Sequence, residues 1–286
     1  MDLVTITFEE EYDLLKLQAA SVAKFVHNVN KIHIISNSDV DLSFIKPYYG
    51  KYQNNVKIHY WYDFDWNIDN THYDAQQVLK CMATDVVETD WYVLLDTKNF
   101  FIRNHILAKP LASLYGRQGF AFRPKERLWW ENICKFFEVD SSNLPLLYST
   151  PFFTNKQIMQ DMVYYVEKHS GLTINDYFTI MNQHEDTKVL EFFLYSAYML
   201  REHQYEDKYT MVDRFVSSVW PGTVDMKHCQ VGYLQSDNRL FASGIHRNAY
   251  PIIDVHIWKK YICHSLQLMD EQEFDNIVYK RIAVSA

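Results

Sequence analysis

Asp96 is the residue whose position in this sequence most favours chemistry, because it ends an unbroken apolar run. Residues 91–95 read Trp-Tyr-Val-Leu-Leu, which is typical of a buried strand. A carboxylate where such a strand emerges is costly unless a positive group pairs with it. Mn²⁺ or Mg²⁺ would satisfy it, since these ions take carboxylate oxygens together with diphosphate oxygens. The alternative is a structural role, in which Asp96 caps the next turn or pairs with Arg103.

Acidic side chains also follow the other strands expected in the first hundred residues. The positions just after those strands are Thr7 with residues 9–11, residues 36–39 and residues 62–65, and each set contains an acid. Ligands of open α/β sheets bind beyond the carboxyl ends of the parallel strands. An edge this acidic suits a metal ion or a hydroxyl-rich ligand better than bare phosphate.

A late segment, residues 242–248, places Gly244, His246 and Arg247 together. Imidazole can bind Mn²⁺, or donate to a phosphate when it is charged, and an arginine grips phosphate with two hydrogen bonds. The segment therefore predicts a phosphate or metal contact. A surface loop with a basic tip is the competing interpretation.

Glu191 stands in an expected helix of mostly apolar residues. A carboxylate held there can act as a general base or hold an acceptor hydroxyl, and residues 185–186 offer two further acids. The structural alternative is an ion pair with Lys188 or Arg201 at the edge of the core.

The elements that must position these residues follow an alternating pattern. Strands are expected at residues 3–7, 31–36, 56–61 and 91–95, with helices at 12–26 and 73–87. This order predicts an α/β fold, a mostly parallel sheet with covering helices. Later, helices are expected at 155–168, 188–201, 254–268 and 271–281, and short strands at 120–122, 209–216, 230–234 and 240–241. The absence of repeats and flexible linkers indicates one domain over residues 1–286.

Composition and missing motifs narrow the class of protein. The net charge of −8 argues against tight nonspecific binding to nucleic acid. The sequence contains no dinucleotide-binding GxGxxG after the first strand, no Walker loop, no GxSxG and no HExxH. Oxidoreductases of the Rossmann type, nucleotide hydrolases, serine hydrolases and zinc proteases are therefore disfavoured.

Two segments resemble a known family. Residues 72–80 (HYDAQQVLK), Asp85 and residues 90–101 (DWYVLLDTKNFF) resemble glycosyltransferases of the A-type (GT-A) fold, and more narrowly a poorly characterised group with a QQxxK helix and an aspartate motif. Residues 5–13 (TITFEEEYD) resemble the opening of that group. The similarity is good over residues 1–105 and thin afterwards. It implies a GT-A-like, Rossmann-type sheet with a nucleotide-binding half (1–105) and an acceptor-binding half (106–286) that ends in helices.

The resemblance also implies an activity and a set of site residues. The activity is transfer of a sugar from a nucleoside-diphosphate sugar to a hydroxyl group of a glycan or another acceptor. Asp96 and Glu191 are the expected catalytic residues. The expected contacts to the sugar nucleotide are Thr7, Glu10, Asn37, Gln77, Lys80, Lys98, Asn99, His246 and Arg247.

The sequence departs from the family at its hallmark, Asp-x-Asp, because residues 96–98 read Asp-Thr-Lys. In one interpretation Asp96 binds Mn²⁺ or Mg²⁺ with help from Asn99 and His246. In the other, Lys98 neutralises the diphosphate and no metal is needed. The first is our expectation. The departure also keeps open a catalytically inactive relative that binds nucleotide or sugar.

The expected location is the cytoplasm. The chain starts without a basic and apolar leader, no run approaches the ~20 apolar residues of a membrane span, and the four cysteines are scattered. These features predict a soluble protein with free thiols. A viral origin, which the A/T-like composition suggests, would make a modified DNA base the alternative acceptor.

Overall fold

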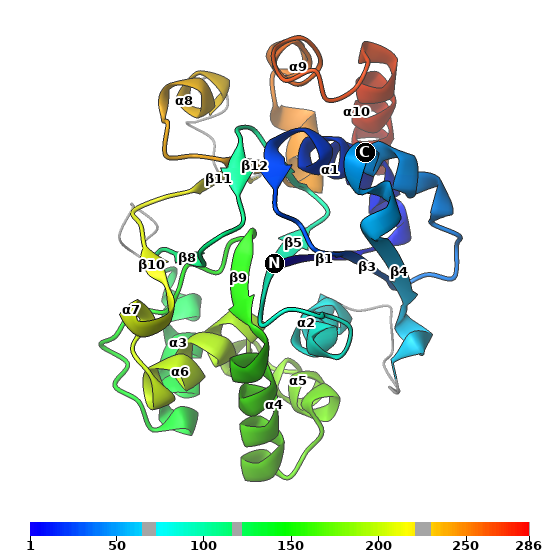
Figure 1. Cartoon of the computed structure of the whole chain (residues 1–286). Helices are drawn as coiled ribbons and strands as arrows, with labels where there is room; N and C mark the ends of the chain where they lie inside the picture. Colours follow the sequence, from blue (N-terminus) through cyan, green and yellow to red (C-terminus); the bar gives the residue numbers. More distant parts are fainter. Residues whose placement is uncertain (65–72, 116–121, 221–229, 286) are drawn as a thin grey trace.

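A five-stranded sheet forms the centre of the protein (Figure 1). The computed structural model describes residues 1–64, 73–115, 122–220 and 230–285, and every structural statement below concerns these residues. In spatial order the strands are β4 (Val56–Tyr60), β3 (Ile32–Ser36), β1 (Asp2–Thr7), β5 (Trp91–Asp96) and β9 (Phe152–Asn155). The first four run parallel and β9 runs antiparallel to β5.

The order of the strands reverses between β1 and β5. From β1 the chain moves outward through β3 to β4, and it then crosses back to add β5 on the other side of β1. The register pairs Ile6 with Asp96 and Thr7 with Ser36, so these strands end at one edge. A reversal of this kind opens a crevice at the carboxyl ends of the strands, where α/β proteins bind ligands.

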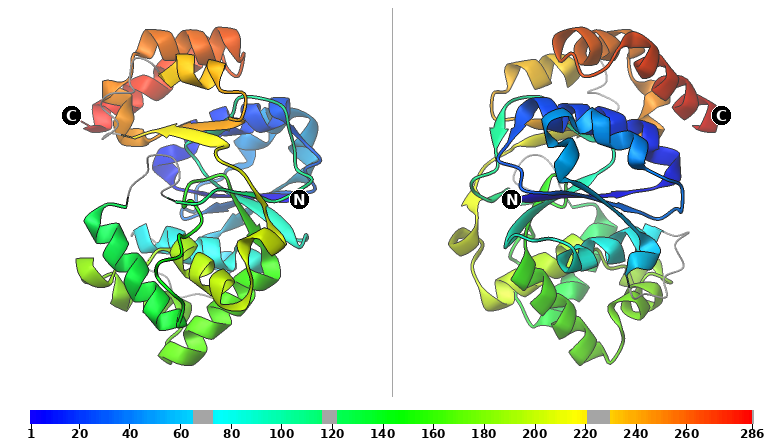
Figure 2. Two further views of the ribbon diagram at one scale, coloured as in Figure 1. Left: turned by 90° about the vertical axis from the view of Figure 1, so that its left-hand side faces the viewer. Right: turned by 45° about the vertical axis from the view of Figure 1, so that its right-hand side comes forward.

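Helices cover both faces of the sheet (Figure 2). One face carries α1 (Tyr12–Phe25) and the 3-10 segment η2 (Ser43–Asn55), which pack on each other. The opposite face carries α2 (Tyr73–Met82), α3 (Pro124–Phe137), α4 (Lys156–Ser170), α5 (Ile174–Met181) and α6 (Glu191–Glu202).

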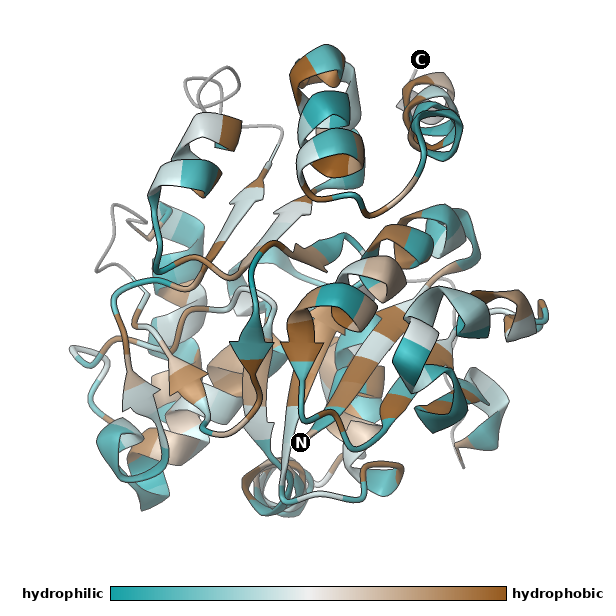
Figure 3. Ribbon diagram, turned by 45° about the horizontal axis from the view of Figure 1, so that its top comes forward, coloured by the Kyte–Doolittle hydropathy of each residue, from teal (hydrophilic) through white to brown (hydrophobic). Residues whose placement is uncertain are grey.

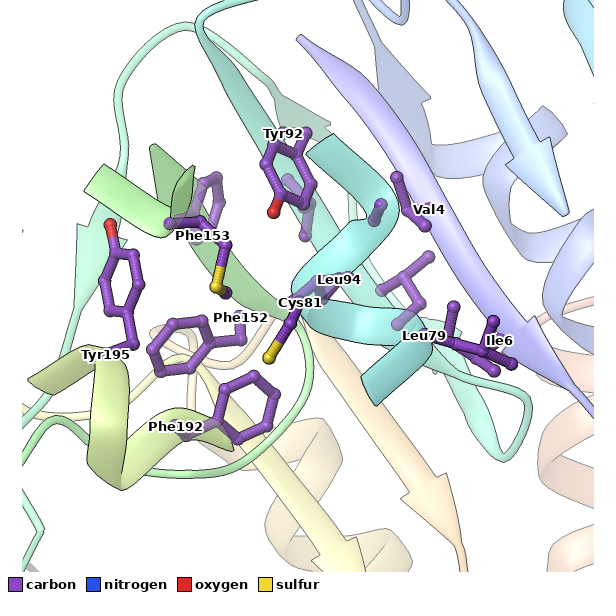
Figure 4. Close-up of a cluster of buried hydrophobic side chains, with 14 of the residues drawn as sticks. Val4, Ile6, Leu79, Cys81, Tyr92, Leu94, Phe152, Phe153, Phe192 and Tyr195 are labelled. Atoms are coloured by element: carbon purple, nitrogen blue, oxygen red, sulfur yellow. The ribbon is translucent and has the colours of Figure 1, made fainter. Parts of the chain in front are cut away.

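The alternation of side chains along each strand decides which helix layer a residue meets. In β1, Thr5 donates to Gln18 of α1 (Oγ1–Oε1 2.7 Å), whereas Val4 and Ile6 point to the other face. There they join side chains of α2, β5, β9 and α6 in an aromatic-rich core (Figure 4). Asp96 shares the face of Tyr92 and Leu94 because it lies two residues further along the same strand.

A second, smaller core lies between α1 and the C-terminal helices (Figure 3). Leu14 and Leu17 of α1 belong to this core, whereas Leu15 and Val22 belong to the main one. The C-terminal elements are α8 (Gln230–Ser236), η7 (Arg247–Ile252), α9 (Val255–Lys259), the π-helical η8 (Lys260–Ser265) and α10 (Glu271–Ser285).

A three-stranded sheet joins these helices to the site region. Its order is β11 (Val216–Val219), β12 (Ala242–Ile245) and β6 (Asn99–Phe101), and β12 runs antiparallel to β6. Because β6 directly follows β5 in the sequence, this pairing brings a late part of the chain to the end of β5.

Shorter elements complete the fold. Two-stranded pairs form between β2 (Val26–His27) and β7 (His105–Ile106) and between β8 (Leu111–Ala112) and β10 (Thr210–Met211). One short α-helix is α7 (Tyr205–Lys208), and the 3-10 turns are η1 (Glu9–Glu11), η3 (Trp61–Asp63), η4 (Ala83–Asp85) and η5 (Glu185–Thr187).

The predicted fold class is confirmed, since the mostly parallel sheet is flanked by helices and the chain ends in helices. The strand predicted at residues 230–234 is wrong: this apolar run forms the start of α8, and short apolar runs do not separate strand from helix. The strand predicted at 209–216 divides into β10 and the first residue of β11. The strand predicted at 240–241 begins instead at Ala242, and the one predicted at 120–122 lies largely outside the described residues.

None of the helices in the described parts of the chain combines the length and the apolar character that a bilayer crossing needs. Cys81, Cys134 and Cys263 are free thiols, and Cys229 falls outside the described residues.

Candidate active site

A cavity of about 930 Å³ opens at the carboxyl edge of the sheet, where the strand order reverses. Its walls come from the segments that follow β1, β3, β4 and β5, from the residues before β9 and α6, and from the end of β12. The lining residues are Phe8, Glu9, Glu10, Glu11, Asn37, Ser38, Asp39, Val40, Trp61, Gln76, Lys80, Asp96, Lys98, Tyr148, Ser149, Thr150, Leu190, Glu191, Phe192, Trp220, His246 and Arg247.

Asp96 lies in this cavity between two ammonium groups. Lys80 Nζ is 3.0 Å from its Oδ1, and Lys98 Nζ forms an ion pair with its Oδ2. Thr150 Oγ1 donates a further hydrogen bond to Oδ2 over 2.9 Å. Burial by itself raises the pKa of Asp96, but the attraction of the two lysines outweighs it and holds the pKa well below its ordinary value. Asp96 is therefore a carboxylate at all physiological pH values.

Lys80 connects Asp96 to Glu191. Its Nζ lies 2.9 Å from Glu191 Oε1 and 4.8 Å from the centre of the Phe192 ring. The side chains of Lys80 and Glu191 are only 6% and 4% exposed, so their ion pair is shielded from water. Glu191 is the first residue of α6, where the helix dipole favours a negative charge. Three charges from three separate elements thus form one buried chain.

Backbone contacts fix the end of β5. Asn99 Oδ1 accepts from Asp96 N (2.8 Å), and Asn99 Nδ2 donates to Thr150 O (2.9 Å). Gln18 Nε2 donates to Asp96 O over 2.8 Å. These bonds hold the backbone of Asp96, while its side-chain carboxylate contacts the two lysines.

β12 delivers His246 and Arg247 to the same place. Gly244 pairs with Asn99 across the small sheet, and a Cβ atom there would stand 3.0 Å from Ser218 Oγ and 3.2 Å from Lys98 O. Glycine permits this close approach of the backbones. The two residues after β12 therefore line the cavity beside Lys98.

His246 is a neutral ring at physiological pH. Burial, together with the nearby positive charges of Lys98 and Arg247, lowers its pKa to about 4. Its Nδ1 accepts a hydrogen bond from Asn248 N (3.2 Å), and its ring stacks on Trp220 with the centroids 4.7 Å apart. His246 thus offers an aromatic face and one remaining ring nitrogen to a ligand.

Arg247 is the most accessible cation of the site, with 51% of its side chain exposed. Its Nη1 lies 3.9 Å from Glu11 Oε1, an ion pair that is loose enough to reorganise around a ligand. Burial raises the pKa of Glu11, while Arg247 and Lys98 oppose that rise.

Two walls of the cavity differ in character. Beyond the ends of β3 and β4, Trp61 Nε1 donates to Asp39 Oδ1 (3.2 Å) beside Ser38. On the other side Tyr148 and Phe192 line the cavity, and Tyr148 is held by Glu126, which accepts from its hydroxyl over 2.7 Å. The first wall offers an aromatic ring with polar neighbours, and the second offers aromatic and hydroxyl groups.

The structure brings eight of the predicted residues together around the cavity: Glu10, Asn37, Lys80, Asp96, Lys98, Glu191, His246 and Arg247. Thr7, Gln77 and Asn99 are buried just behind its wall. Gln77 Oε1 accepts from Glu191 N (3.1 Å), so it supports α6, while its neighbour Gln76 lines the cavity.

The alternative ion pairs considered for these acids do not form. Arg103 donates to backbone carbonyls of residues 234–240 rather than to Asp96. Arg201 pairs with Glu138 and Glu202, and Lys188 pairs with Glu185.

Sequence reasoning missed several lining residues, namely Phe8, Trp61, Gln76, Tyr148, Thr150, Phe192 and Trp220. Phe8 directly follows a predicted strand, so a stricter reading of strand ends finds it. Gln76 belongs to the QQxxK helix, of which Gln77 and Lys80 were the predicted contacts. The remaining positions belong to no motif, and only the tertiary structure places them here.

The donor set around Asp96 does not fit Mn²⁺ or Mg²⁺. A cation would need Asp96 and His246 as ligands, but both oxygens of Asp96 already face ammonium groups. The described ranges also contain no group of three or more His, Cys, Asp or Glu side chains arranged to hold a metal ion. A divalent ion at Asp96 would lie beside two ammonium groups, and their positive charges would repel it.

Comparisons with known proteins give a family match and similarity to solved structures. The family model described as "Family of unknown function (DUF6492)" matches residues 6–228, a range that contains Asp96, Lys98 and Glu191 but ends before β12. No curated protein matches the sequence. Among solved structures, a galactosyltransferase, LgtC, determined in complex with donor and acceptor sugar analogs, is 8% identical, with a TM-score of 0.47 over 98% of this chain and 95% of that one.

Proposed function

We propose a sugar-transfer function for this chain, which belongs to the DUF6492 family of unknown function. In this proposal the cavity at Asp96 binds a nucleoside-diphosphate sugar, and the protein transfers the sugar to an acceptor hydroxyl. The observation that carries the proposal is the gathering of Lys80, Lys98 and Arg247 at the carboxyl edge of a parallel sheet. The resemblance of residues 72–101 to A-type glycosyltransferases supports the same activity.

The cations match the charge that sugar transfer creates. When the bond between the anomeric carbon and the phosphate oxygen breaks, its electron pair leaves with the diphosphate. Lys98 and Arg247 line the cavity where they can donate to those oxygens, and positive groups held in advance are an effective way to lower such a barrier. These residues would supply most of the acceleration.

One wall of the cavity suits the nucleoside of the donor, and the other suits the acceptor. Trp61, with Asp39 and Asn37 beside it, offers a ring and hydrogen-bonding groups to a nucleoside. Tyr148, Phe192 and Glu191 face the other side, where the acceptor would lie. In this arrangement Glu191 orients the attacking hydroxyl, whose oxygen forms the new bond to the anomeric carbon while its proton passes to the Glu191 carboxylate. Lys80 balances the charge of Glu191 before the transfer.

A panel of UDP-, GDP- and dTDP-sugars tests the proposal. Binding of a donor to the native protein should raise its melting temperature, and the same donor should release its nucleoside diphosphate slowly in the absence of acceptor. An Asp96→Asn variant that remains folded should lose this release. A wild-type protein that neither binds nor cleaves any donor would refute sugar transfer.

A second function, nucleotide binding without turnover, has one observation in its favour. Glu191, the candidate base, is already paired with Lys80 in a buried contact. A donor that stabilises the protein but is never cleaved, with and without simple sugar acceptors, would identify this second function.

A further inference from the structure

The positive charge at Asp96 comes from the chain itself. Lys80 and Lys98 contact one carboxylate oxygen each, so the position that a metal ion would take beside this aspartate is shared by two ammonium groups. Glu191 balances one of these two charges through its contact with Lys80. Arg247 and Glu11, which also line the cavity, form a further and looser ion pair.

Lys98 is held so that its charge faces the cavity. It occupies the third position of the motif, where the resembling enzymes carry a second aspartate. Its ammonium group pairs with Asp96 and lies 5.0 Å from the centre of the Trp220 ring, and its side chain is 13% exposed. Two contacts therefore restrain a lysine that still lines the cavity.

Lys80 is the deeper of the two cations. It reaches Asp96 and Glu191 from α2 and is almost completely shielded from water. A divalent ion near Asp96 would have to approach both lysines, and like charges repel strongly when their side chains are largely shielded from solvent. The same two charges attract the anionic oxygens of a diphosphate.

We infer that this chain binds the diphosphate of its donor without a divalent cation, with Lys98 as the direct contact and Lys80 as the charge behind it. The inference rests on the proposed function and specifies its cofactor chemistry. Asp96 then acts as a positioning residue, because it orients two lysines instead of ligating a metal. During transfer the electron pair of the broken carbon–oxygen bond stays on the diphosphate, and the ammonium groups compensate the added charge.

Calorimetric titration of the whole chain with UDP, GDP and inorganic pyrophosphate tests the inference. Each probe is titrated once in EDTA and once with Mn²⁺. We expect at least one nucleotide to bind with the same Kd, to within about twofold, in both buffers. Lys98→Met should weaken binding by roughly 10- to 100-fold in both buffers, as expected when a hydrogen bond to a charged group is lost.

Two variants control for charge and folding. Lys98→Arg keeps the cation and should bind within about tenfold of the wild type, since a hydrogen bond can be retained while the geometry changes. Lys125→Met removes an exposed lysine of α3 that does not line the cavity, and it should bind as the wild type does. Circular dichroism confirms that each variant is folded.

The outcomes separate the inference from the proposed function. Binding that requires Mn²⁺ overturns the inference but leaves sugar transfer standing. Binding in EDTA that Lys98→Met does not weaken also overturns it, since another group then carries the charge. If none of the probes binds in either buffer, the proposed function itself fails.

Discussion

Replacing Lys80 by methionine should destabilise the protein severely, because it leaves two buried acids facing each other. Methionine keeps the unbranched shape of lysine but not its charge. Lys80 Nζ lies 3.0 Å from Asp96 and 2.9 Å from Glu191. At an effective dielectric constant of about 20, each contact corresponds to roughly 5–6 kcal/mol of attraction before the cost of burying the charges is subtracted.

The net loss should be smaller than this gross attraction. Asp96 retains Lys98 and Thr150 in the variant, whereas Glu191 has no other ion-pair partner within the described part of the chain. Removing one member of a buried ion pair typically costs about 3–5 kcal/mol. We expect Lys80→Met to lower the free energy of unfolding by that amount, and Glu191→Gln in the same background to restore about 1–2 kcal/mol by removing the unpaired charge.

Urea denaturation followed by circular dichroism measures these differences, and an unchanged m value shows that the unfolding transition is comparable between variants. Lys125→Met is the matched control, since its ion pair with Glu185 is exposed and should contribute less than about 1 kcal/mol. A loss in Lys80→Met no larger than that of the control would refute the buried, coupled network.

Three further predictions concern Gly244 and His246 at the site and Asp2 at the start of β1. Gly244→Ala should destabilise the protein by about 1–3 kcal/mol in urea denaturation, because the new Cβ would lie only 3.0 Å from Ser218 Oγ. The same substitution should weaken nucleotide binding. Unchanged stability would contradict the close packing at this position. His246 should titrate near pH 4 in an NMR pH series, since burial lowers its pKa to about 4, and a midpoint near 6.5 would contradict its placement. For Asp2, burial raises the pKa, but the nearby His33 and hydrogen bonds from Asn30 Nδ2 and Glu88 N outweigh this and hold it below its ordinary value. Its stabilisation is therefore present above about pH 4 and is lost as the pH falls through the folded value. Between about pH 5 and pH 2 the wild type should therefore lose more unfolding free energy than Asp2→Asn does, and equal losses in the two proteins would contradict this role.

The first half of the fold could be predicted because its elements are long and regular. The apolar run of β5 that ends at Asp96 and the helical spacing of α2 are local signals in the sequence. Both identify the edge of the sheet where the cavity opens. His246 and Arg247, the residues after β12, were predicted from their types and from the family resemblance. Their arrival depends on the pairing of Gly244 with Asn99, which no local pattern contains.

The ion-pair partners of Asp96 could not be predicted from local sequence patterns. Sequence spacing suggested Arg103, which is seven residues away, but the true partners are Lys98 and a lysine from the preceding helix. Lys80 meets Glu191 across 111 positions of the sequence. Such contacts follow from the packing of α2 between β1 and α6. The family resemblance predicted Lys80 as a contact to the ligand. The structure adds that Lys80 forms ion pairs with both Asp96 and Glu191.

The most direct test of the whole account is a crystal structure of the protein with a bound nucleoside diphosphate. The account predicts diphosphate oxygens within hydrogen-bonding distance of Lys98 Nζ and the Arg247 guanidinium, with the base toward Trp61. A nucleotide bound away from the Asp96 cavity, or a diphosphate there that contacts neither cation, would contradict it.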